Sequence, residues 1–302
     1  MATVTTQPVA RRRDRTGNLQ REKGMSLPAL IAMYTVLTVV GLLAAFPFYW
    51  MLVASTHRSA TILTSPPPLV FGGALLQNYQ ELTSQINFWR TMWNSVLVSG
   101  ISTILTLFFC SLGGYGFAKF QFPGRDKLFG MMLATMMIPG ILGIIPSFML
   151  MRWLGWLNPD WRNYLPLIVP GVASAFGIFW MRQYIQSSIP NDLMDAARID
   201  GAHEFRIYWN VILPVITPAL AALAIMTFMG KWNDFFWPLV ILKEESMWTL
   251  PVALASLQGL YGQEEGVRLL GATIGIMPIM IVFLLSARQF MAGLTAGAVK
   301  GA

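Results

Sequence analysis

Long apolar runs recur along the chain, and six of them have about the length that a helix needs to cross a membrane. The hydrocarbon core of a bilayer is about 30 Å thick and takes about 20 residues of helix. Only 12% of the residues are charged, against about 25% in an average soluble domain. The sequence therefore predicts an all-α polytopic membrane protein with six transmembrane helices. The runs lie at about Leu27–Val53, Met92–Ala118, Leu128–Leu154, Tyr164–Ile185, Ile216–Ile241 and Leu269–Ala292.

The net charge of +7 is concentrated before the first apolar run. Basic residues next to a membrane span favour the cytoplasmic side. We therefore expect residues 1–26 to form a basic cytoplasmic tail, and six crossings to return the C-terminus to the same side. The first run is too long for the 7–15-residue core of a cleavable signal. In a soluble domain this charge would favour nucleic acid, but next to a span it does not, so no nucleic acid partner is expected.

Few residues of the chain could hold a metal ion. The chain has one cysteine, Cys110, and two histidines, His57 and His203, which lack the HxxxH or HExxH spacing of a metal site. We predict no metal site, no cofactor on this chain and no catalytic residues.

A charged passage, "DLMDAARIDGAHEFRIYWNVILPVITP" (192–218), lies between two of the apolar runs. Six of its first 15 residues are charged. A charge at the bilayer centre costs about 2.5–3.5 kcal/mol, so six would cost on the order of 15 kcal/mol or more. This passage must therefore lie outside the hydrocarbon, and the six-span layout places it in the cytoplasm.

The passage also has the pattern of two short amphipathic helices joined by a glycine. Pro190 fits a first helical turn, and Asn191 or Asp192 can cap it. The first helix places Leu193, Ala196 and Ala197 on one face, and Gly201 can take the left-handed turn that ends it. The second helix places four apolar residues at i, i+3, i+4, i+7 spacing: Phe205, Tyr208, Trp209 and Ile212. These features alone are compatible with an ordinary loop on the membrane or with a docking element for a partner.

"DAARIDGA" (195–202) followed by "ILPVITP" (212–218) resembles the EAA loop of binding-protein-dependent ABC importer permeases. Other stretches are similar to the carbohydrate branch of that family, the MalG type: "GYGFAKFQFPGR" (114–125), "MMIPGILGIIPSFML" (136–150), "WNDFFWPLVIL" (232–242) and "MAGLTAGAVKG" (291–301). The resemblance implies a type I ABC importer (MetI/MalG-like) transmembrane domain over residues 27–302, with a cytoplasmic coupling helix in the loop 190–214.

In this family the EAA loop sits in a cleft of the cytoplasmic ATPase and transmits its movement. The resemblance implies that Asp195, in place of the usual Glu, faces the ATPase, while Ala196 and Ala197 pack against it and Gly201 makes the turn. The residues to which it assigns ATPase coupling are Asp195, Ala196, Ala197, Asp200, Gly201, Leu213 and Pro214. It also implies that the tail Thr295–Gly301 contacts the ATPase.

The resemblance implies a subunit of a larger assembly in the cell (inner, cytoplasmic) membrane. The implied partners are a second homologous, MalF-like permease, two copies of an ABC ATPase that bind ATP and Mg²⁺, and an extracytoplasmic solute-binding protein that touches Lys243–Gly266. The chain itself lacks the Walker A pattern GxxxxGK[ST], because Ile225 stands where its only Gly–Lys pair would need the first glycine. We therefore predict a sugar permease that is not an enzyme.

Two alternatives remain open for the function. Glycerol phosphate-type permeases look much alike, and their cargo favours cationic groups, for which Lys231 is a candidate. A self-sufficient secondary transporter would need ion-coupling acids inside its spans, and Asp234 is the candidate.

The substrate pathway could include Trp232, Asn233, Asp234 and Phe235, with rings stacking on sugars and polar groups bonding hydroxyls. The other interpretation is an aromatic belt at the outer interface, with Lys231 extended toward water. We also expect Gly113, Gly114 and Gly116 to permit close helix packing, and Pro139 and Pro146 to bend the third span.

Overall fold

The computed structural model describes residues 26–260 and 264–299, with side chains described up to 257 and from 264 to 287. The predicted basic tail, apart from Ser26, and the side chains of the predicted ATPase-contacting segment Thr295–Gly301 lie outside the described residues. The chain divides into two units, Met1–Trp50 and Met51–Ala302.

The described residues form helices, turns and loops and contain no strand. Three helices are long and apolar enough to cross a membrane: α1 (Leu27–Ala54), α4 (Phe88–Lys119) and the first 23 residues of α15 (Glu265–Val299). The other elements are α2 (Ser59–Ile62), α3 (Leu75–Gln85), α5 (Arg125–Thr135), η1 (Gly140–Gly143), α6 (Ile144–Trp153), η2 (Trp161–Tyr164), α7 (Leu165–Ile168), η3 (Val169–Gly171), α8 (Ala175–Ser188), α9 (Asn191–Ile199), α10 (Glu204–Ile207), η4 (Tyr208–Ile212), α11 (Leu213–Val215), α12 (Thr217–Trp232), α13 (Phe236–Ile241), η5 (Glu245–Met247) and α14 (Leu250–Leu260).

Three further stretches reach spanning length only as bent pairs. Arg125–Thr135 and Gly140–Trp153 meet at 91°, Trp161–Gly171 and Ala175–Ser188 at 46°, and Glu204–Val215 and Thr217–Trp232 at 78°. If each pair contributes one span, the total is six, as the sequence predicted. The predicted fifth span began only at Ile216, so Glu204–Val215 belongs to the charged passage. The first bend contains Pro139, as expected, whereas Pro146 lies inside α6.

The structure corrects the single helix predicted for 216–241. Helix α12 ends at Trp232, and α13 begins at Phe236. Asp234 lies in the interruption, and its carboxylate accepts a hydrogen bond from the Trp237 backbone N–H at 3.3 Å. The polar pair Asn233–Asp234 therefore interrupts an otherwise apolar segment, because a side-chain acceptor before a helix competes with the continuing helix.

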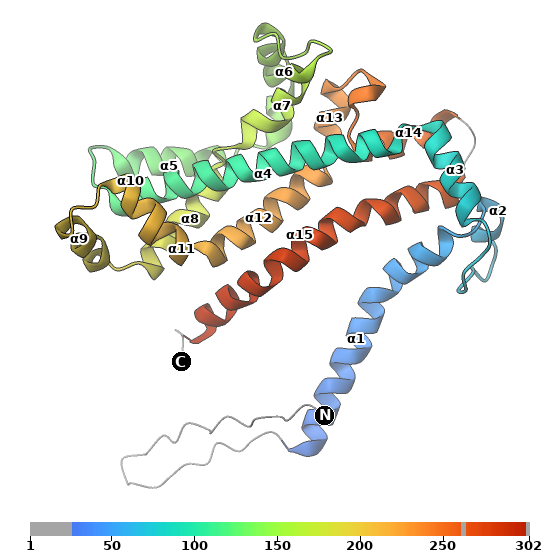
Figure 1. The fold of residues 1–302 in the computed structure, drawn as a ribbon, viewed down its shortest axis with the longest axis horizontal. Coiled ribbons are helices and arrows are strands. Elements are labelled where there is room, and N and C mark those ends of the chain that lie inside the picture. The colour runs from blue at the N-terminus through green and yellow to red at the C-terminus, as the bar shows by residue number, and fades with distance from the viewer. Residues whose placement is uncertain (1–25, 261–263, 300–302) are drawn as a thin grey trace. The chain divides into compact units, whose positions relative to one another are not determined.

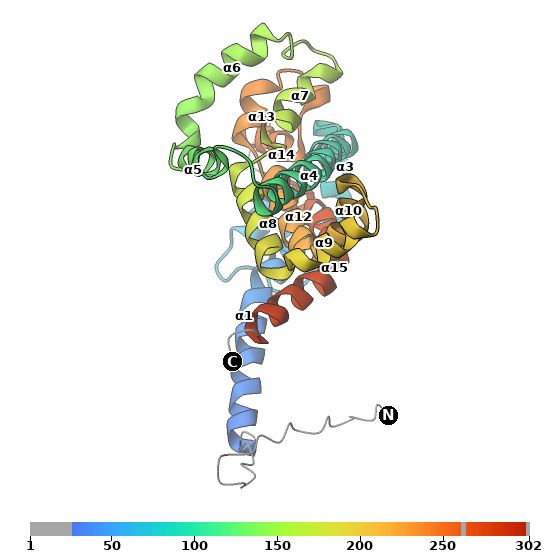
Figure 2. The same ribbon diagram turned by 90° about the vertical axis from the view of Figure 1, so that its left-hand side faces the viewer.

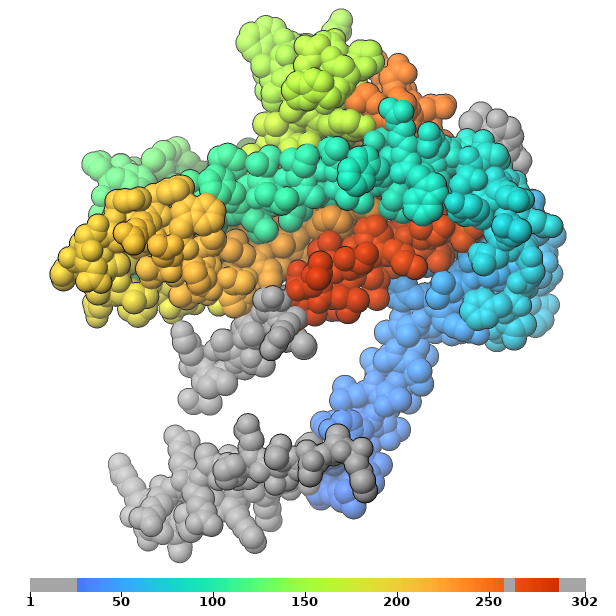
Figure 3. Space-filling model, in the orientation of Figure 1, coloured from blue at the N-terminus to red at the C-terminus, as the bar shows by residue number. Residues whose placement is uncertain are grey.

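Helix α4 is the central element of the unit Met51–Ala302. It packs along α8 and α12, and α15 packs on α12 and α3 (Figure 1). The space-filling view shows α4 running between two ends of the bundle (Figure 3). The end that carries α9 and α10 is called the hairpin end below, and the end that carries α3 and α14 the opposite end.

Glycines allow α4 and α8 to approach closely. A Cβ on Gly114 would lie 2.6 Å from Met181 Cβ and 2.9 Å from the Arg182 backbone nitrogen, and one on Gly113 would lie 3.2 Å from Ile178. A Cβ on Gly116 would meet nothing within 4 Å. The packing role predicted from the sequence therefore holds for Gly113 and Gly114 but is wrong for Gly116, which faces away from α8.

Helix α5 packs on α8 through the buried Phe129, and α6 extends away from the bundle beyond it (Figure 2). Their connection and α6 expose large apolar side chains, including Met137 (85% exposed) and Trp153 (81% exposed). A membrane-spanning chain can expose such residues to lipid or to another subunit.

At the opposite end, ionic and amide contacts join the segment after α1 to α3 and α15. Arg58 forms ion pairs with Glu81 at 2.6 Å and with Glu264 at 3.1 Å. The Asn78 side-chain amide donates to the carbonyls of Ser55 and His57, each at 2.9 Å. These contacts tie three separate segments of the chain into one junction.

Candidate functional site

The charged passage folds into a helical hairpin at one end of the bundle, formed by α9, α10, η4 and α11 (Figure 1). Helix α9 begins at Asn191, with Pro190 in extended conformation as its N-cap rather than in the first turn as predicted. The predicted glycine turn is present. Gly201 has φ +78°, and the backbone N–H groups of Gly201 and Ala202 donate to the carbonyls of Arg198 and Ala197, each at 3.0 Å. This is the Schellman arrangement that ends a helix.

The second arm of the hairpin differs from the regular amphipathic helix that the spacing predicted. Helix α10 has only four residues, and the turn after it, η4, is a π-helix. The wider turn shifts the register by one residue. As a result Ile207, Tyr208 and Ile212 are buried, whereas Phe205 and Trp209, which the spacing placed on the same face, are 54% and 45% exposed.

Buried side chains connect the hairpin to the bundle. Met194 of α9 and Ile207, Tyr208 and Ile212 share one apolar core with Cys110 and Tyr115 of α4 and Met181 and Ile185 of α8. Burying an apolar side chain of this size contributes about 1.5–3 kcal/mol. The hairpin is therefore a packed part of the bundle.

Three side chains of α4 bond the hairpin directly. Ser111 Oγ and Tyr208 OH are 2.6 Å apart, and Tyr115 OH donates to Glu204 Oε2 at 2.7 Å. Lys119 Nζ donates to the Ile189 carbonyl at 2.5 Å and to Asn191 Oδ1 at 2.9 Å. These three anchors were not predicted, because their only signal in the sequence is a polar residue every four positions near the end of an apolar helix.

Arg198 joins the two arms of the hairpin. Its guanidinium forms an ion pair with Asp195 at 2.9 Å and another with Glu204 at 2.8 Å. The hydrogen bond from Arg198 lowers the pKa of Glu204, against the opposing effect of partial burial. A continuous chain of bonds thus runs from Asp195 through Arg198 and Glu204 to Tyr115 on α4.

The seven residues assigned to coupling occupy two faces of the hairpin. Asp195, Ala196, Asp200, Gly201 and Pro214 are exposed, whereas Ala197 and Leu213 are partly buried against the core. The predicted pair Ala196–Ala197 is therefore divided, with Ala196 outward and Ala197 inward. The outward face also carries Leu193 and Ile199, which are 44% and 87% exposed.

Glu204→Gln is expected to loosen the hairpin, because it replaces the carboxylate that forms an ion pair with Arg198 and accepts a hydrogen bond from Tyr115. The folded pKa of Glu204 lies below the ordinary value of 4.5, so its carboxylate stabilises the hairpin at neutral pH, and this contribution is lost as the pH falls below 4.5. Loss of one hydrogen bond to a charged group should raise the rate of trypsin cleavage after Arg198 by about threefold to tenfold in the purified chain in detergent.

The matched control for this prediction is Asp192→Asn, since Asp192 is exposed and forms no ion pair within the described residues. It should be cleaved at the wild-type rate. Equal cleavage of the two variants would contradict the anchoring role of Glu204.

The four residues predicted for a substrate pathway do not converge on one cavity. Trp232 is 3% exposed and stacks on Phe228, with ring centroids 5.5 Å apart. Asn233 is exposed and donates to the Met229 carbonyl, and Asp234 accepts from the Trp237 backbone. Phe235 is 40% exposed. Lys231 does not extend toward water, because its Nζ donates to the Leu167 carbonyl at 2.6 Å.

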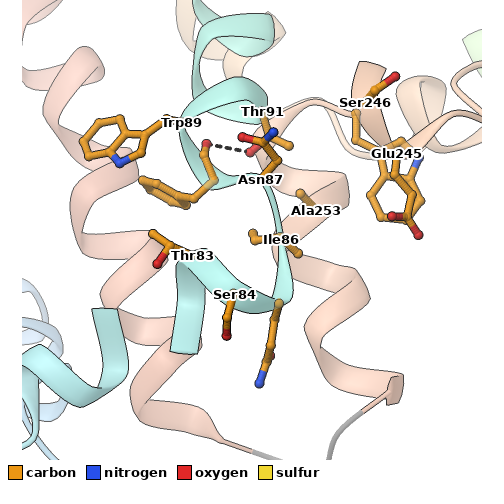
Figure 4. A pocket seen from close by; sticks show the side chains of 12 residues that line it. Thr83, Ser84, Ile86, Asn87, Trp89, Thr91, Glu245, Ser246 and Ala253 are labelled. Atoms are coloured by element: carbon orange, nitrogen blue, oxygen red, sulfur yellow. Dashed lines mark hydrogen bonds between the residues drawn. The ribbon is translucent and has the colours of Figure 1, made fainter. Parts of the chain in front are cut away.

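An open cleft of about 560 Å³ lies at the opposite end, between the α3–α4 junction and the residues around η5. Figure 4 shows Asn87 and Thr91 on one side and Glu245 and Ser246 on the other. The cleft is also lined by Trp89 and Trp248, so it combines aromatic, amide, hydroxyl and carboxylate groups. Within the described residues, His, Cys, Asp and Glu side chains form no group of three that could hold a metal ion.

The fold and the hairpin together define a class of protein: a helical membrane protein with several spans whose connecting loop is a structured, charged hairpin packed on the bundle. The family model described as the inner membrane component of binding-protein-dependent transport systems matches residues 111–296. The chain belongs to this family, and the resemblance drawn from "DAARIDGA" to permease subunits of carbohydrate ABC importers is confirmed.

Several relatives match nearly the whole chain. The lactose transport system permease protein LacG of Rhizobium radiobacter is 35% identical, covering 89% of this chain and 96% of its own. The arabinooligosaccharides transport system permease protein AraQ of Halalkalibacterium halodurans is 36% identical, covering 92% of this chain and 100% of its own. The sn-glycerol-3-phosphate transport system permease protein UgpE of Escherichia coli is 29% identical, covering 87% of this chain and 95% of its own.

A solved structure is also similar. It is the crystal structure of a bacterial ABC transporter involved in the import of the acidic polysaccharide alginate. The matched chain has 26% sequence identity and a TM-score of 0.72, with 88% of this chain and 99% of the other covered. The MetI-type helical fold predicted from the sequence is therefore confirmed.

Proposed function

We propose that this chain is the membrane-spanning permease subunit of an ATP-driven importer of mono- or oligosaccharides. It forms half of the translocation pathway, and its hairpin receives the movement of a separate ATPase. The observation that carries this proposal is the connection of the hairpin to α4 and α8 through a shared apolar core and three side-chain anchors. A movement imposed on the hairpin would therefore move membrane helices.

The exposed face of the hairpin fits a protein partner. Asp195 and Asp200 carry negative charge, while Leu193 and Ile199 are apolar and exposed. Apolar side chains outside the lipid are stabilised when a partner covers them. Two copies of a cytoplasmic ABC ATPase, each binding ATP and Mg²⁺, would supply this partner, one copy docking here and the other on a second homologous permease.

The proposed orientation places the hairpin end in the cytoplasm of a cell whose inner or cytoplasmic membrane holds the complex. Both termini would lie on the same side. The charge of the passage and the basic tail support this orientation, since positive residues stay on the cytoplasmic side. An extracytoplasmic solute-binding protein would then meet the opposite end, where the cleft between Asn87 and Glu245 opens.

Sugar is favoured over glycerol phosphate as cargo by relatives named for lactose and arabinooligosaccharides, at 35% and 36% identity. The UgpE relative is 29% identical. The one cation considered for a phosphate, Lys231, is bonded to a backbone carbonyl. The secondary-transporter alternative loses support for a similar reason, because Asp234 accepts from a backbone N–H at the start of α13.

The proposal is tested by purifying the tagged chain from membranes of its own cell in mild detergent. We expect a second permease and an ABC ATPase to co-purify. Proteoliposomes with this complex, the solute-binding protein and internal ATP should accumulate radiolabelled lactose or arabinooligosaccharide but not sn-glycerol 3-phosphate. Absence of any ATPase from the purified complex would refute the proposal, and uptake of the phosphate alone would refute its sugar cargo.

A further inference from the structure

The bent pair α7–α8 contains a broken segment, Pro166–Ser174, that begins inside α7, passes through the 3-10 turn η3 and ends just before α8. Helix α7 gives way to the 3-10 turn η3 at Val169, and α8 begins only at Ala175. A break within a spanning segment frees backbone carbonyls that have no water to bond. Such a break is tolerated where donors from neighbouring helices bond the freed carbonyls. The donors that bond these carbonyls therefore show what holds the segment in place.

Two of these carbonyls are satisfied from α12 and α13. Pro170 has no N–H, so the carbonyl of Pro166, four residues earlier, cannot receive the usual helical bond. The indole Nε1 of Trp237 donates to this carbonyl instead, at 3.0 Å. The next carbonyl, Leu167, accepts from the ammonium group of Lys231 at 2.6 Å.

Helix α4 contacts the next carbonyls of the same segment. Thr106 Oγ1 donates to the Gly171 carbonyl at 3.5 Å, and Cys110 Sγ lies 3.6 Å from the Val172 carbonyl. The segment is therefore held from two sides, by weak hydroxyl and thiol contacts from α4 and by a charged and an indole donor from α12 and α13. The shorter bonds are those from Lys231 and Trp237.

Lys231 is placed closely against the segment. A Cβ on Gly171 would lie 3.4 Å from Lys231 Nζ, so a glycine at this position leaves room for the ammonium group. An ionisable residue within a membrane span is costly and generally marks a functional position. The local cost is reduced by the bond to the Leu167 carbonyl.

Helix α12 connects this contact to the hairpin. It begins at Thr217, two residues after α11 ends, and carries Lys231 in its last turn. Sixteen residues of helix extend for about 24 Å. Ala219 and Leu223 of α12 also lie in the apolar core of the hairpin, so a displacement of the hairpin acts on α12 across the 78° bend and reaches the carbonyl of Leu167.

We propose that Lys231 and Trp237 are positioning residues that couple α12 to the broken segment Pro166–Ser174, so that movement of the hairpin changes the shape of this segment during transport. This inference rests on the proposed function for the role of the hairpin. Neither residue is assigned a contact with cargo. Their role is to hold two backbone carbonyls at a fixed place relative to α12.

The test uses the complete importer in lipid nanodiscs and proteoliposomes. Lys231→Met keeps the side-chain length but removes the charge and the donors, and Lys231→Arg keeps a charged donor. Trp237→Phe removes the indole N–H while keeping a ring. The matched control is Lys127→Met, the same change at an exposed lysine of α5.

We expect Lys231→Met and Trp237→Phe to assemble with the ATPase and to lower the maximal rate of sugar uptake by about tenfold, the effect of one lost bond to a charged or buried group. The KM for the sugar-loaded binding protein should stay unchanged. Amide hydrogen exchange in Gly171–Ser174 should become about tenfold faster. Lys231→Arg should restore part of the rate, and Lys127→Met should match the wild type.

Uptake and exchange equal to those of Lys127→Met in both variants would overturn the inference, as would a change in KM alone. If Lys231→Met does not assemble, Trp237→Phe decides the question. The proposed function fails separately, through the absence of an ATPase from the wild-type complex, so the two failures are distinguishable.

Discussion

Gly201→Val is expected to leave the chain in the membrane but to weaken docking of the ATPase and to lower sugar uptake by more than tenfold. Gly201 has φ +78°, and a Cβ there would meet nothing within 4 Å, so the cost is one of backbone conformation rather than of space. The left-handed region costs an L-residue about 1–2 kcal/mol and a β-branched residue more. Val should therefore open the Schellman turn and misplace Asp195 relative to Glu204.

Two substitutions control for this effect. Gly201→Asn should keep most of the activity, because Asn takes the left-handed conformation more readily. Gly124 has φ +82° before α5, so Gly124→Val introduces the same strain outside the hairpin. ATPase co-purification and uptake are the measurements. Wild-type ATPase co-purification and uptake in Gly201→Val would contradict a specific role of this turn. Equal losses of both in Gly124→Val would contradict it as well.

Gly114→Leu is expected to prevent the chain from accumulating in the membrane. Even a Cβ at this position would lie 2.6 Å from Met181 Cβ and 2.9 Å from the Arg182 backbone nitrogen. A backbone atom cannot move aside without shifting α8, and one methyl group in excess costs about 1–3 kcal/mol in a packed interior. The milder Gly114→Ala should accumulate but show a lower Tm in detergent.

Gly116→Leu is the matched control, two residues further along the same helix. Gly116 meets nothing within 4 Å and lines an apolar cavity of about 360 Å³ with Tyr115, Phe120 and Phe205. The leucine side chain of Gly116→Leu should fit into this cavity, so the abundance of the variant in the membrane, measured by immunoblot, should remain near the wild-type level. Similar loss in both leucine variants would show that α4 tolerates no bulk at this end, contrary to the close approach seen at Gly114 and not at Gly116.

The membrane class of this chain was predictable from its sequence because it depends on local composition. A run of about 20 apolar residues has one favourable environment whatever its neighbours are. The same holds for the hairpin turn at Gly201, which depends on the few residues around it. The family resemblance is likewise carried by short contiguous motifs, and the match over residues 111–296 confirms it.

The faces of the hairpin were only partly predictable. Regular helical spacing grouped Phe205 and Trp209 with Tyr208 and Ile212, but a π-turn changed the register and left the first two exposed. No local pattern marks this turn, because it depends on which side chains find room between α4 and α8.

From the residues alone it follows that this chain spans a membrane as helices and turns sharply at Gly201, since both depend on residues close together in the chain. Only the tertiary structure decided where the polar side chains within the spans are directed. Lys231 could extend toward water or bond Leu167, and Tyr115 could face lipid or Glu204. Each choice depends on a carbonyl or carboxylate more than 60 residues away, and the position of that partner is set by packing.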